Sequence, residues 1–176
     1  AVVAALASRR APVREPGIDE LLAIHGDRIT ATTDVTRAVH GSDVTFVVVP
    51  TPSAPDGSFS PSNVVSAVQS IGAATRVKAA PHLVVVASTV SPGTMDAVVR
   101  PALEVAAGRS CGQQLGLCYS PQFIALGTIL RDLSHPDLVL IGESDPAAGA
   151  RLDELVRHIT SGSPRIARMT FVNAEL

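Results

Sequence analysis

Two hydroxyl-bearing turns are the residues of this chain best placed to do chemistry, and each follows an apolar stretch. Val44 to Val49 ends in Pro50-Thr51-Pro52, and Leu83 to Ala87 ends in a turn that begins with Ser88-Thr89. Ligands of open α/β sheets bind outside the carboxyl ends of parallel strands, where hydroxyls and backbone N–H groups can face an anion. Thr51 and Thr89 therefore mark a candidate ligand edge. Turn formation is the alternative interpretation, since Thr and Pro often end strands.

Gly93 and Thr94 open the segment that follows the second turn, where the sequence predicts a helix. Free N–H groups and the helix dipole favour a phosphate or carboxylate oxygen at such a start. A plain helix start without a ligand is the alternative interpretation of these two residues.

The other reactive side chains favour structural roles. Cys111 and Cys118 lie seven residues apart without a nearby cluster of metal ligands, which indicates buried thiols in a reduced, intracellular protein and no metal site. The five histidines do not pair with an obvious nucleophile, so solvated or capping histidines are expected.

The length and composition are those of one globular domain, with 176 residues of which 46% are hydrophobic and mostly aliphatic. A net charge of −2 gives no basic excess, so nucleic acid is not an expected partner. No apolar stretch approaches the ~20 residues of a membrane helix, and no leader opens the chain. A cytoplasmic protein without membrane contact is therefore expected.

Strand-like and helix-like segments alternate along the chain. The expected strands are Arg28 to Thr33, Val44 to Val49, Leu83 to Ala87, Leu115 to Tyr119, Leu138 to Ile141 and Arg165 to Met169. The expected helices are Ala1 to Arg10, Pro16 to about Gly26, Asp34 to His40, a segment opened by Ser60-Pro61, Gly93 to Gly108 with Pro101 as a kink or break, and Asp145-Pro146 to about His158. This order predicts an α/β fold with a mostly parallel sheet, helices on both faces and right-handed crossovers.

Six short blocks carry a resemblance to a known family. In chain order they are Glu15-Pro16-Gly17-Ile18-Asp19-Glu20-Leu21-Leu22, Ala31-Thr32-Thr33-Asp34, Val49-Pro50-Thr51-Pro52 with Asp56-Gly57, Ser88-Thr89-Val90 with Pro92-Gly93-Thr94, Ser120-Pro121-Gln122-Phe123, and Pro136-Asp137 to Ile141-Gly142. Six blocks in register are far more specific than any one motif. Over nearly the whole chain they resemble the Rossmann-like NAD-binding domain of the UDP-glucose/GDP-mannose dehydrogenases.

The resemblance implies an NAD-dependent oxidoreductase that converts the C6 alcohol of a nucleotide sugar to a carboxylate, of the UDP-glucose to UDP-glucuronate type. In that family two NAD molecules act in succession, and a cysteine forms a thiohemiacetal and then a thioester. UDP-glucose, UDP-N-acetyl-mannosamine and GDP-mannose enzymes share these motifs, so the sugar stays open. The family also implies a homo-oligomer for the complete protein and a role in polysaccharide biosynthesis.

The resemblance assigns roles to both turns. Pro50, Thr51, Ser88 and Thr89 are similar to cofactor-binding positions, with Thr51 beside the dinucleotide. Thr89 is the candidate catalytic residue, because the matching threonine lies near the nicotinamide, where a hydroxyl can hold the water that hydrolyses the thioester.

The segment from Tyr119 to Gly127 is similar to the family's Pro-Glu-Phe-Leu-x-Glu-Gly loop, which lines the sugar site. Gln122, Phe123, Ile124 and Leu126 are therefore candidate substrate-binding residues. Gln122 and Leu126 stand where the family has glutamates, and neither an amide nor an aliphatic group can act as a general base. Phe123 and Ile124 are expected to shape the pocket, with a packing role alone as the alternative.

The sequence departs from the family at both ends. None of its thirteen glycines forms the G-x-G-x-x-G fingerprint that cradles a pyrophosphate, and Cys118 does not match the family's nucleophile. We therefore expect residues 1–169 to be a partial NAD-binding domain without its first βαβ unit, and residues 170–176 to begin a connecting helix toward a missing part. In the strand order 3-2-1-4-5-6 the strand at 44–49 would then become an edge with unpaired backbone groups.

Three interpretations of function stay open. The first is a part of a nucleotide-sugar 6-dehydrogenase that is inactive alone. The second is a binding-only or regulatory remnant that pairs with a complete homologue through its open sheet edge, which co-purification with a full-length dehydrogenase would favour. The third is another Rossmann oxidoreductase, such as a short-chain or hydroxyacid enzyme, which an aldehyde or hydroxyacid preference would favour.

Overall fold

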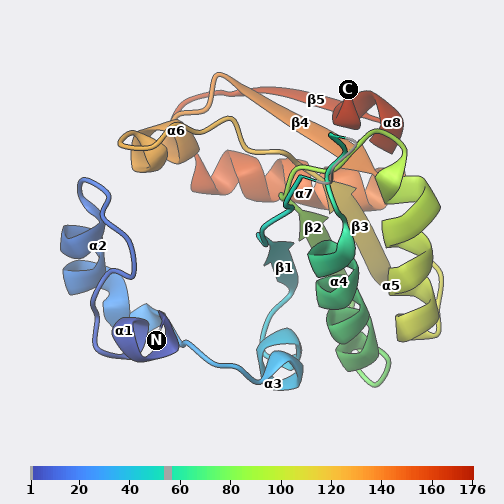
Figure 1. Cartoon of the computed structure of the whole chain (residues 1–176), viewed down its shortest axis with the longest axis horizontal. Coiled ribbons are helices and arrows are strands. Elements are labelled where there is room, and N and C mark those ends of the chain that lie inside the picture. The colour runs from blue at the N-terminus through green and yellow to red at the C-terminus, as the bar shows by residue number, and fades with distance from the viewer. Residues whose placement is uncertain (1, 54–56) are drawn as a thin grey trace.

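A five-stranded sheet forms the centre of the protein (Figure 1). The computed structural model describes residues 2–53 and 57–176, so Ala1 and the Asp56 of the third sequence block lie outside the described residues. The strands follow chain order in space, and they are β1 (Val44–Val47), β2 (His82–Val86), β3 (Leu115–Tyr119), β4 (Leu138–Glu143) and β5 (Arg165–Met169). β1, β2 and β3 are parallel, β4 is antiparallel to β3, and β5 is parallel to β4. The predicted α/β class with a mostly parallel sheet is confirmed.

Helices cover both faces of the sheet, as the alternation of segments predicts. One face packs against α3 (Val35–His40), α4 (Ser62–Thr75) and α5 (Arg100–Ala107), and the other packs against α7 (Pro146–Ile159). Along β2 the side chains alternate between the two cores, with Val84 and Val86 in the first and Leu83 and Val85 in the second. Every residue of β2 is buried, which explains why its sequence is an unbroken apolar run after His82.

Local signals fix most helix boundaries. Asp34 and Asp145 cap α3 and α7 through their carboxylates, as predicted. The expected start of α4 is wrong by one residue, because Pro61 is the cap position and Ser60 bonds to the Ser62 hydroxyl instead of capping the helix. Pro101 follows a π-helical segment, η2 (Met95–Val99), so the predicted kink takes the form of a change in helical register before α5.

α4 and α5 approach each other closely at Gly72. A Cβ atom at this position would lie 2.8 Å from both the Ala106 Cβ and the Leu103 carbonyl oxygen. Glycine is required here because the neighbouring backbone occupies the space of a side chain.

Because β4 is antiparallel to β3, β4 and β5 extend beyond the carboxyl ends of the first three strands. β4 pairs with β3 through its last two residues only, Gly142 and Glu143, so most of β4 extends past the end of β3. β5 lies along β4, and α8 (Phe171–Glu175) then folds back on the sheet with Phe171 and Ala174 buried beside Gly142. The chain between β3 and β4 contains α6 (Ile129–Ser134).

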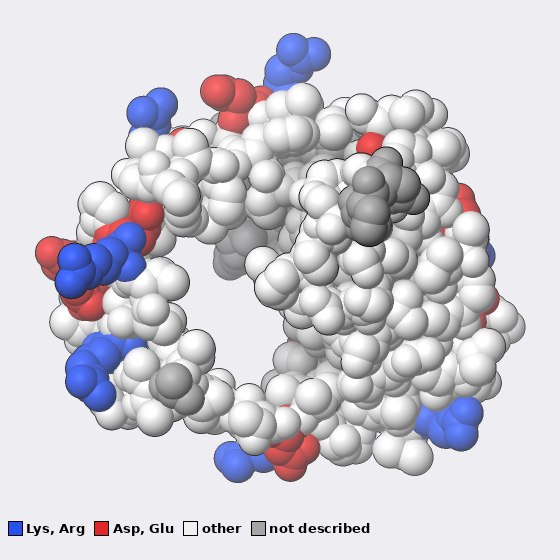
Figure 2. Space-filling view, in the orientation of Figure 1, with Lys and Arg blue, Asp and Glu red and all other residues white. Residues whose placement is uncertain are grey.

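The predicted strand at Arg28 to Thr33 is not formed. Arg28 ends a 3₁₀ turn, η1 (Gly26–Arg28), and Ile29 is extended, but the segment pairs with no strand of the described chain. A strand needs a partner for its N–H and C=O groups, and the space between this segment and β1 is open (Figure 2). The N-terminal helices α1 (Val2–Ala7) and α2 (Ile18–His25) lie on the far side of that opening.

β1 is an edge strand of the described sheet, as expected from the sequence. Within the described residues it pairs with β2 alone, so one side of its backbone carries no ladder hydrogen bonds. The N-terminal segment instead contacts the loop before α6, where the Glu15 carboxylate accepts hydrogen bonds from the Gly127 and Ile129 N–H groups at 3.0 and 2.8 Å.

Candidate functional site

Three turns meet at one edge of the sheet. β1, β2 and β3 are neighbouring parallel strands, so Thr51, Thr89 and the loop that begins at Ser120 all follow carboxyl ends on the same side. This is the arrangement on which the candidate ligand edge depends. Thr51 is half-buried and Thr89 is exposed, so both hydroxyls can be reached from solvent.

Ser88 joins the first turn to the second. Its buried hydroxyl accepts a hydrogen bond from the Val49 N–H and donates one to the Val49 carbonyl oxygen, both at 2.8 Å. Both bonds occupy the hydroxyl with protein partners, which indicates that Ser88 holds the Pro50-Thr51 turn in place. Its predicted role in cofactor binding stays a prediction.

We expect Ser88→Ala to lower the free energy of unfolding by about 2 kcal/mol, because it leaves the Val49 N–H and carbonyl without their partner. Urea denaturation of the purified chain measures the change. Ser91→Ala is the matched control, since the Ser91 hydroxyl accepts one bond, from the exposed Phe59 N–H at 3.1 Å, and should cost less than half as much. Equal losses of unfolding free energy in the two variants would contradict the role of the Ser88 hydroxyl in holding the Pro50-Thr51 turn.

The helix start after the second turn already holds a carboxylate. Glu175 of α8 accepts hydrogen bonds from the Gly93 N–H through Oε2 and from the Met95 N–H through Oε1, both at 2.7 Å. The sequence predicts a phosphate or carboxylate oxygen here, and the oxygen in the structure comes from the chain itself. Nothing in the local sequence around Gly93 identifies Glu175 as the partner, since it lies 82 residues away.

The candidate substrate loop is exposed at the same edge. The Gln122 amide donates to the Ser120 carbonyl at 3.0 Å, while Phe123, Ile124 and Leu126 have exposed fractions of 61%, 45% and 93%. None of these four side chains can exchange a proton at neutral pH. Their assignment to substrate binding stays a prediction.

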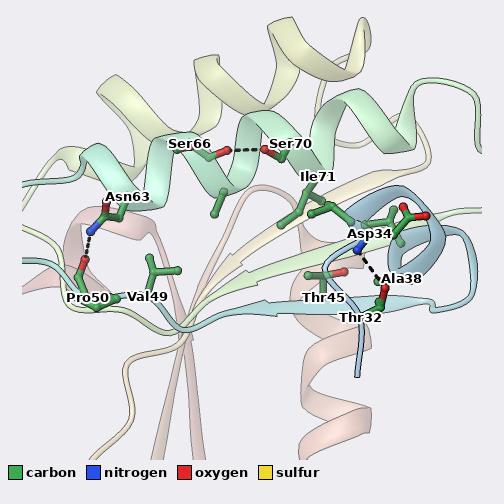
Figure 3. A pocket seen from close by; sticks show the side chains of 13 residues that line it. Thr32, Asp34, Ala38, Thr45, Val49, Pro50, Asn63, Ser66, Ser70 and Ile71 are labelled. Carbon is green, nitrogen blue, oxygen red and sulfur yellow. Dashed lines mark hydrogen bonds between the residues drawn. The ribbon is translucent and has the colours of Figure 1, made fainter. Parts of the chain in front are cut away.

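A groove of about 630 Å³ runs from the Pro50 turn along the open side of β1, between α3 and α4 (Figure 3). Its floor includes Thr45 of β1 and Val49, which follows that strand, and one wall is the small-residue face of α4 with Ser66 and Ser70. Asn63 lies at one end and donates its side-chain N–H to the Pro50 carbonyl at 2.8 Å. Asn63 therefore supports the Thr51 turn, a role that the sequence analysis missed because the two residues belong to different elements.

The expectation of buried thiols is confirmed for Cys118 and is wrong for Cys111, which is only half-buried. Burial raises the pKa of Cys111 and of Cys118 to about 12, so neither thiol is a ready nucleophile. The expectation of solvated or capping histidines is wrong for His82, which is 1% exposed and bonded to Thr45 and Lys78. Among the described residues, no group of three or more His, Cys, Asp or Glu side chains could hold a metal ion.

Comparison with known families decides the assignment. The family model of the NAD-binding domain of UDP-glucose/GDP-mannose dehydrogenases matches residues 1–160. The chain belongs to this family. The resemblance stated from the six blocks is therefore confirmed, and membership of the UDP-glucose/GDP-mannose dehydrogenase family replaces the third interpretation, another Rossmann oxidoreductase.

Curated relatives in this dehydrogenase family are longer than the chain. A GDP-mannose 6-dehydrogenase of Pseudomonas aeruginosa is 36% identical over 95% of the chain and 38% of its own length. UDP-glucose 6-dehydrogenase AglM of Haloferax volcanii is 35% identical over 99% of the chain and 41% of its own length. The chain thus spans about two fifths of the length of these relatives.

Solved structures of dehydrogenases of this family share the fold. A ternary complex of GDP-mannose dehydrogenase from Pseudomonas aeruginosa superposes with a TM-score of 0.92 at 35% identity, over 99% of the chain and 40% of that protein. A UDP-glucose dehydrogenase from Pyrobaculum islandicum gives a TM-score of 0.87 at 33% identity, over 99% and 39%. The described part of the chain contains no helix of the length and apolarity needed to cross a membrane.

NAD is the cofactor of this family's domain, and the residues present fit it in part. Hydroxyl-bearing turns stand at the carboxyl ends of β1 and β2, where a dinucleotide binds in this architecture. The amides of Gly93 and Met95 are already bonded to Glu175, and no glycine-rich turn of the fingerprint type is present in the sequence. The sequence therefore combines hydroxyl-bearing strand-end turns with the lack of a glycine-rich turn of the fingerprint type.

Proposed function

We propose that this chain forms the part of an NAD-dependent nucleotide-sugar 6-dehydrogenase that presents the strand-end turns to the cofactor. The observation that carries the proposal is the parallel pairing of β1 with β2, which puts Thr51 and Thr89 on one edge. Family membership supports NAD as the ligand of that edge. The division at residues 169/170, with α8 as the start of a connecting helix, belongs to the same proposal.

Thr51 and Thr89 have separate roles in this proposal. The Thr51 hydroxyl binds the dinucleotide beside the Pro50 turn, which Ser88 and Asn63 hold in place. The exposed Thr89 hydroxyl orients a water molecule toward the reacting carbon, since a hydroxyl can both donate and accept a hydrogen bond. When bound, NAD supplies the hydride acceptor.

The loop from Ser120 binds the sugar in this proposal. Phe123 and Ile124 give an apolar wall, and the Gln122 amide is fixed by its bond to the Ser120 carbonyl. Since Gln122 and Leu126 carry no titratable group, the base that activates the water belongs to another residue.

The substrate in this proposal is a nucleoside diphosphate sugar, with C6 oxidised from an alcohol to a carboxylate. Relatives named GDP-mannose 6-dehydrogenase and UDP-glucose 6-dehydrogenase support this class, and UDP-glucose to UDP-glucuronate is the type we propose. A homo-oligomer and a cytoplasmic location complete the proposal, with polysaccharide biosynthesis as the process.

Nuclear magnetic resonance of the isotopically labelled chain tests the cofactor edge. Added NAD should shift the Thr51 and Thr89 signals saturably, and nicotinamide mononucleotide should do the same, because the sequence has no glycine-rich turn of the fingerprint type. Thr51→Val should weaken this binding about threefold to tenfold, because it removes one hydrogen bond to the dinucleotide. Thr36→Val, on the exposed side of α3, is the matched control and should bind as the unchanged chain does. Shifts confined to other parts of the chain would overturn the proposal.

A second candidate function rests on the free side of β1. Unpaired backbone groups on an edge strand, beside an apolar groove, favour pairing with another polypeptide, as in a binding-only or regulatory remnant. Co-purification of the tagged chain with a full-length family member, lost when Val48→Lys charges the exposed edge, would favour this candidate.

A further inference from the structure

The turn that carries Thr89 is hydrogen-bonded at both ends to residues from other parts of the chain. At its start, the Ser88 hydroxyl is bonded to Val49. At its end, the Gly93 and Met95 N–H groups each donate to one oxygen of the Glu175 carboxylate at 2.7 Å. The turn is therefore bonded through a hydroxyl to Val49, just after β1, and through a carboxylate to α8.

Burial along the turn directs Thr89 outward. Ser88 and Val90 are 7% and 3% exposed, whereas Thr89 between them is exposed. With its two neighbours anchored in the protein, the orientation of the Thr89 side chain depends on the backbone path from Ser88 to Gly93. Whatever fixes Gly93 therefore helps to fix Thr89.

Glu175 is the last residue of α8, a helix that is packed firmly against the sheet. Phe171 and Ala174 of α8 are buried against β4, where a Cβ at Gly142 would lie 3.0 Å from the Ala174 Cβ and 3.1 Å from the Phe171 ring. Tyr119 of β3 is buried as well, and burial raises its pKa, with a hydrogen bond to the Val90 backbone acting against this shift and the Glu175 charge acting in the same direction. Glu175, Tyr119 and the Thr89 turn are thus one contiguous packing unit.

We propose that Glu175 is a positioning residue that holds the Thr89 turn in the conformation that presents the Thr89 hydroxyl to the ligand edge. Hydrogen bonds from N–H groups to a carboxylate are roughly twice as strong as neutral ones, and the positive end of the following helix adds to the attraction. α8 acts through this contact on a residue about eighty positions earlier in the chain. The inference rests on the proposed function of Thr89.

The test compares Glu175→Gln with Glu104→Gln in the full chain. Glu104 is the matched control, because its carboxylate also accepts from a backbone N–H, that of Cys111 at 2.8 Å, but at the far end of α5. We expect Glu175→Gln to speed amide hydrogen exchange at Gly93 and Met95 about tenfold and to shift the Thr89 amide and methyl signals without NAD. Glu175→Asp, which keeps the charge, should restore part of both effects.

Glu104→Gln should leave the Thr89 signals unchanged. Thr89 signals that do not move in Glu175→Gln would overturn the inference, and so would an equal rise of exchange throughout β2 and β3, which would mean a general loss of stability. Addition of nicotinamide mononucleotide separates the two proposals. If Thr89 shifts with Glu175→Gln but not with this ligand, the cofactor proposal fails while the positioning role of Glu175 stands.

Discussion

Gly72→Val should lower the free energy of unfolding by about 3 kcal/mol, close to the upper range for overpacking a core. The reason is the contact between α4 and α5, where a Cβ would meet the Ala106 Cβ and the Leu103 carbonyl oxygen at 2.8 Å. Neither atom is the flexible end of a side chain, so the two helices must separate. For a domain of this size, a loss of 3 kcal/mol corresponds to a fall in Tm of about 10 °C.

Ala73→Val is the matched control for this prediction. Ala73 precedes the buried Ala74 on α4 and is itself exposed, so the same valine costs only its lower helix propensity, about 0.5 kcal/mol. Thermal and urea unfolding of the two variants measure the difference. Similar midpoints for both would show that the α4–α5 contact tolerates a side chain at Gly72.

The stability of the chain should fall as the pH drops from 6.5 to 4, because of His82. This side chain is 1% exposed at the start of β2, and burial, followed by the charge of Lys78, lowers its pKa to about 4. The Lys78 ammonium donates to His82 Nδ1 at 3.0 Å, so the neutral ring bonds to the Thr45 hydroxyl through Nε2 at 2.9 Å. Asp43 favours and Arg151 disfavours the charged ring, and both effects are smaller.

The sign follows from the two pKa values. Below pH 6.5 the unfolded chain takes up a proton at His82 that the folded chain resists until about pH 4. The free energy of unfolding is therefore highest above pH 6.5, where His82 is neutral in both states. It falls by at most about 3 kcal/mol as the pH drops to 4. Urea unfolding at a series of pH values measures this slope.

His82→Gln removes the titrating ring and keeps a side chain that can bond to Lys78 and Thr45. The difference in stability between this variant and the unchanged chain should shrink steadily from pH 7 to pH 4. His25→Gln, which replaces an exposed histidine at the end of α2, should follow the curve of the unchanged chain. A constant difference between the unchanged chain and His82→Gln would show that His82 does not carry the pH dependence.

The sequence by itself determined the elements whose signals are local. β3 and β5 have the predicted bounds, and Asp34 and Asp145 cap their helices as predicted. Caps and apolar runs act within a few residues, so they can be recognised without knowledge of the fold. The six blocks also identified the family, because their order and spacing are properties of the sequence.

Only the tertiary structure decided the features that depend on a distant partner. The segment at Arg28 to Thr33 has the composition of a strand but no neighbour to pair with, so it forms none. The burial of His82, the bond between Ser88 and Val49, and the contact of Glu175 with Gly93 each join elements far apart in the chain. Hydrogen bonds and burial are satisfied in space and not along the sequence, which is why local patterns could mark the Thr89 turn but not the residues that hold it.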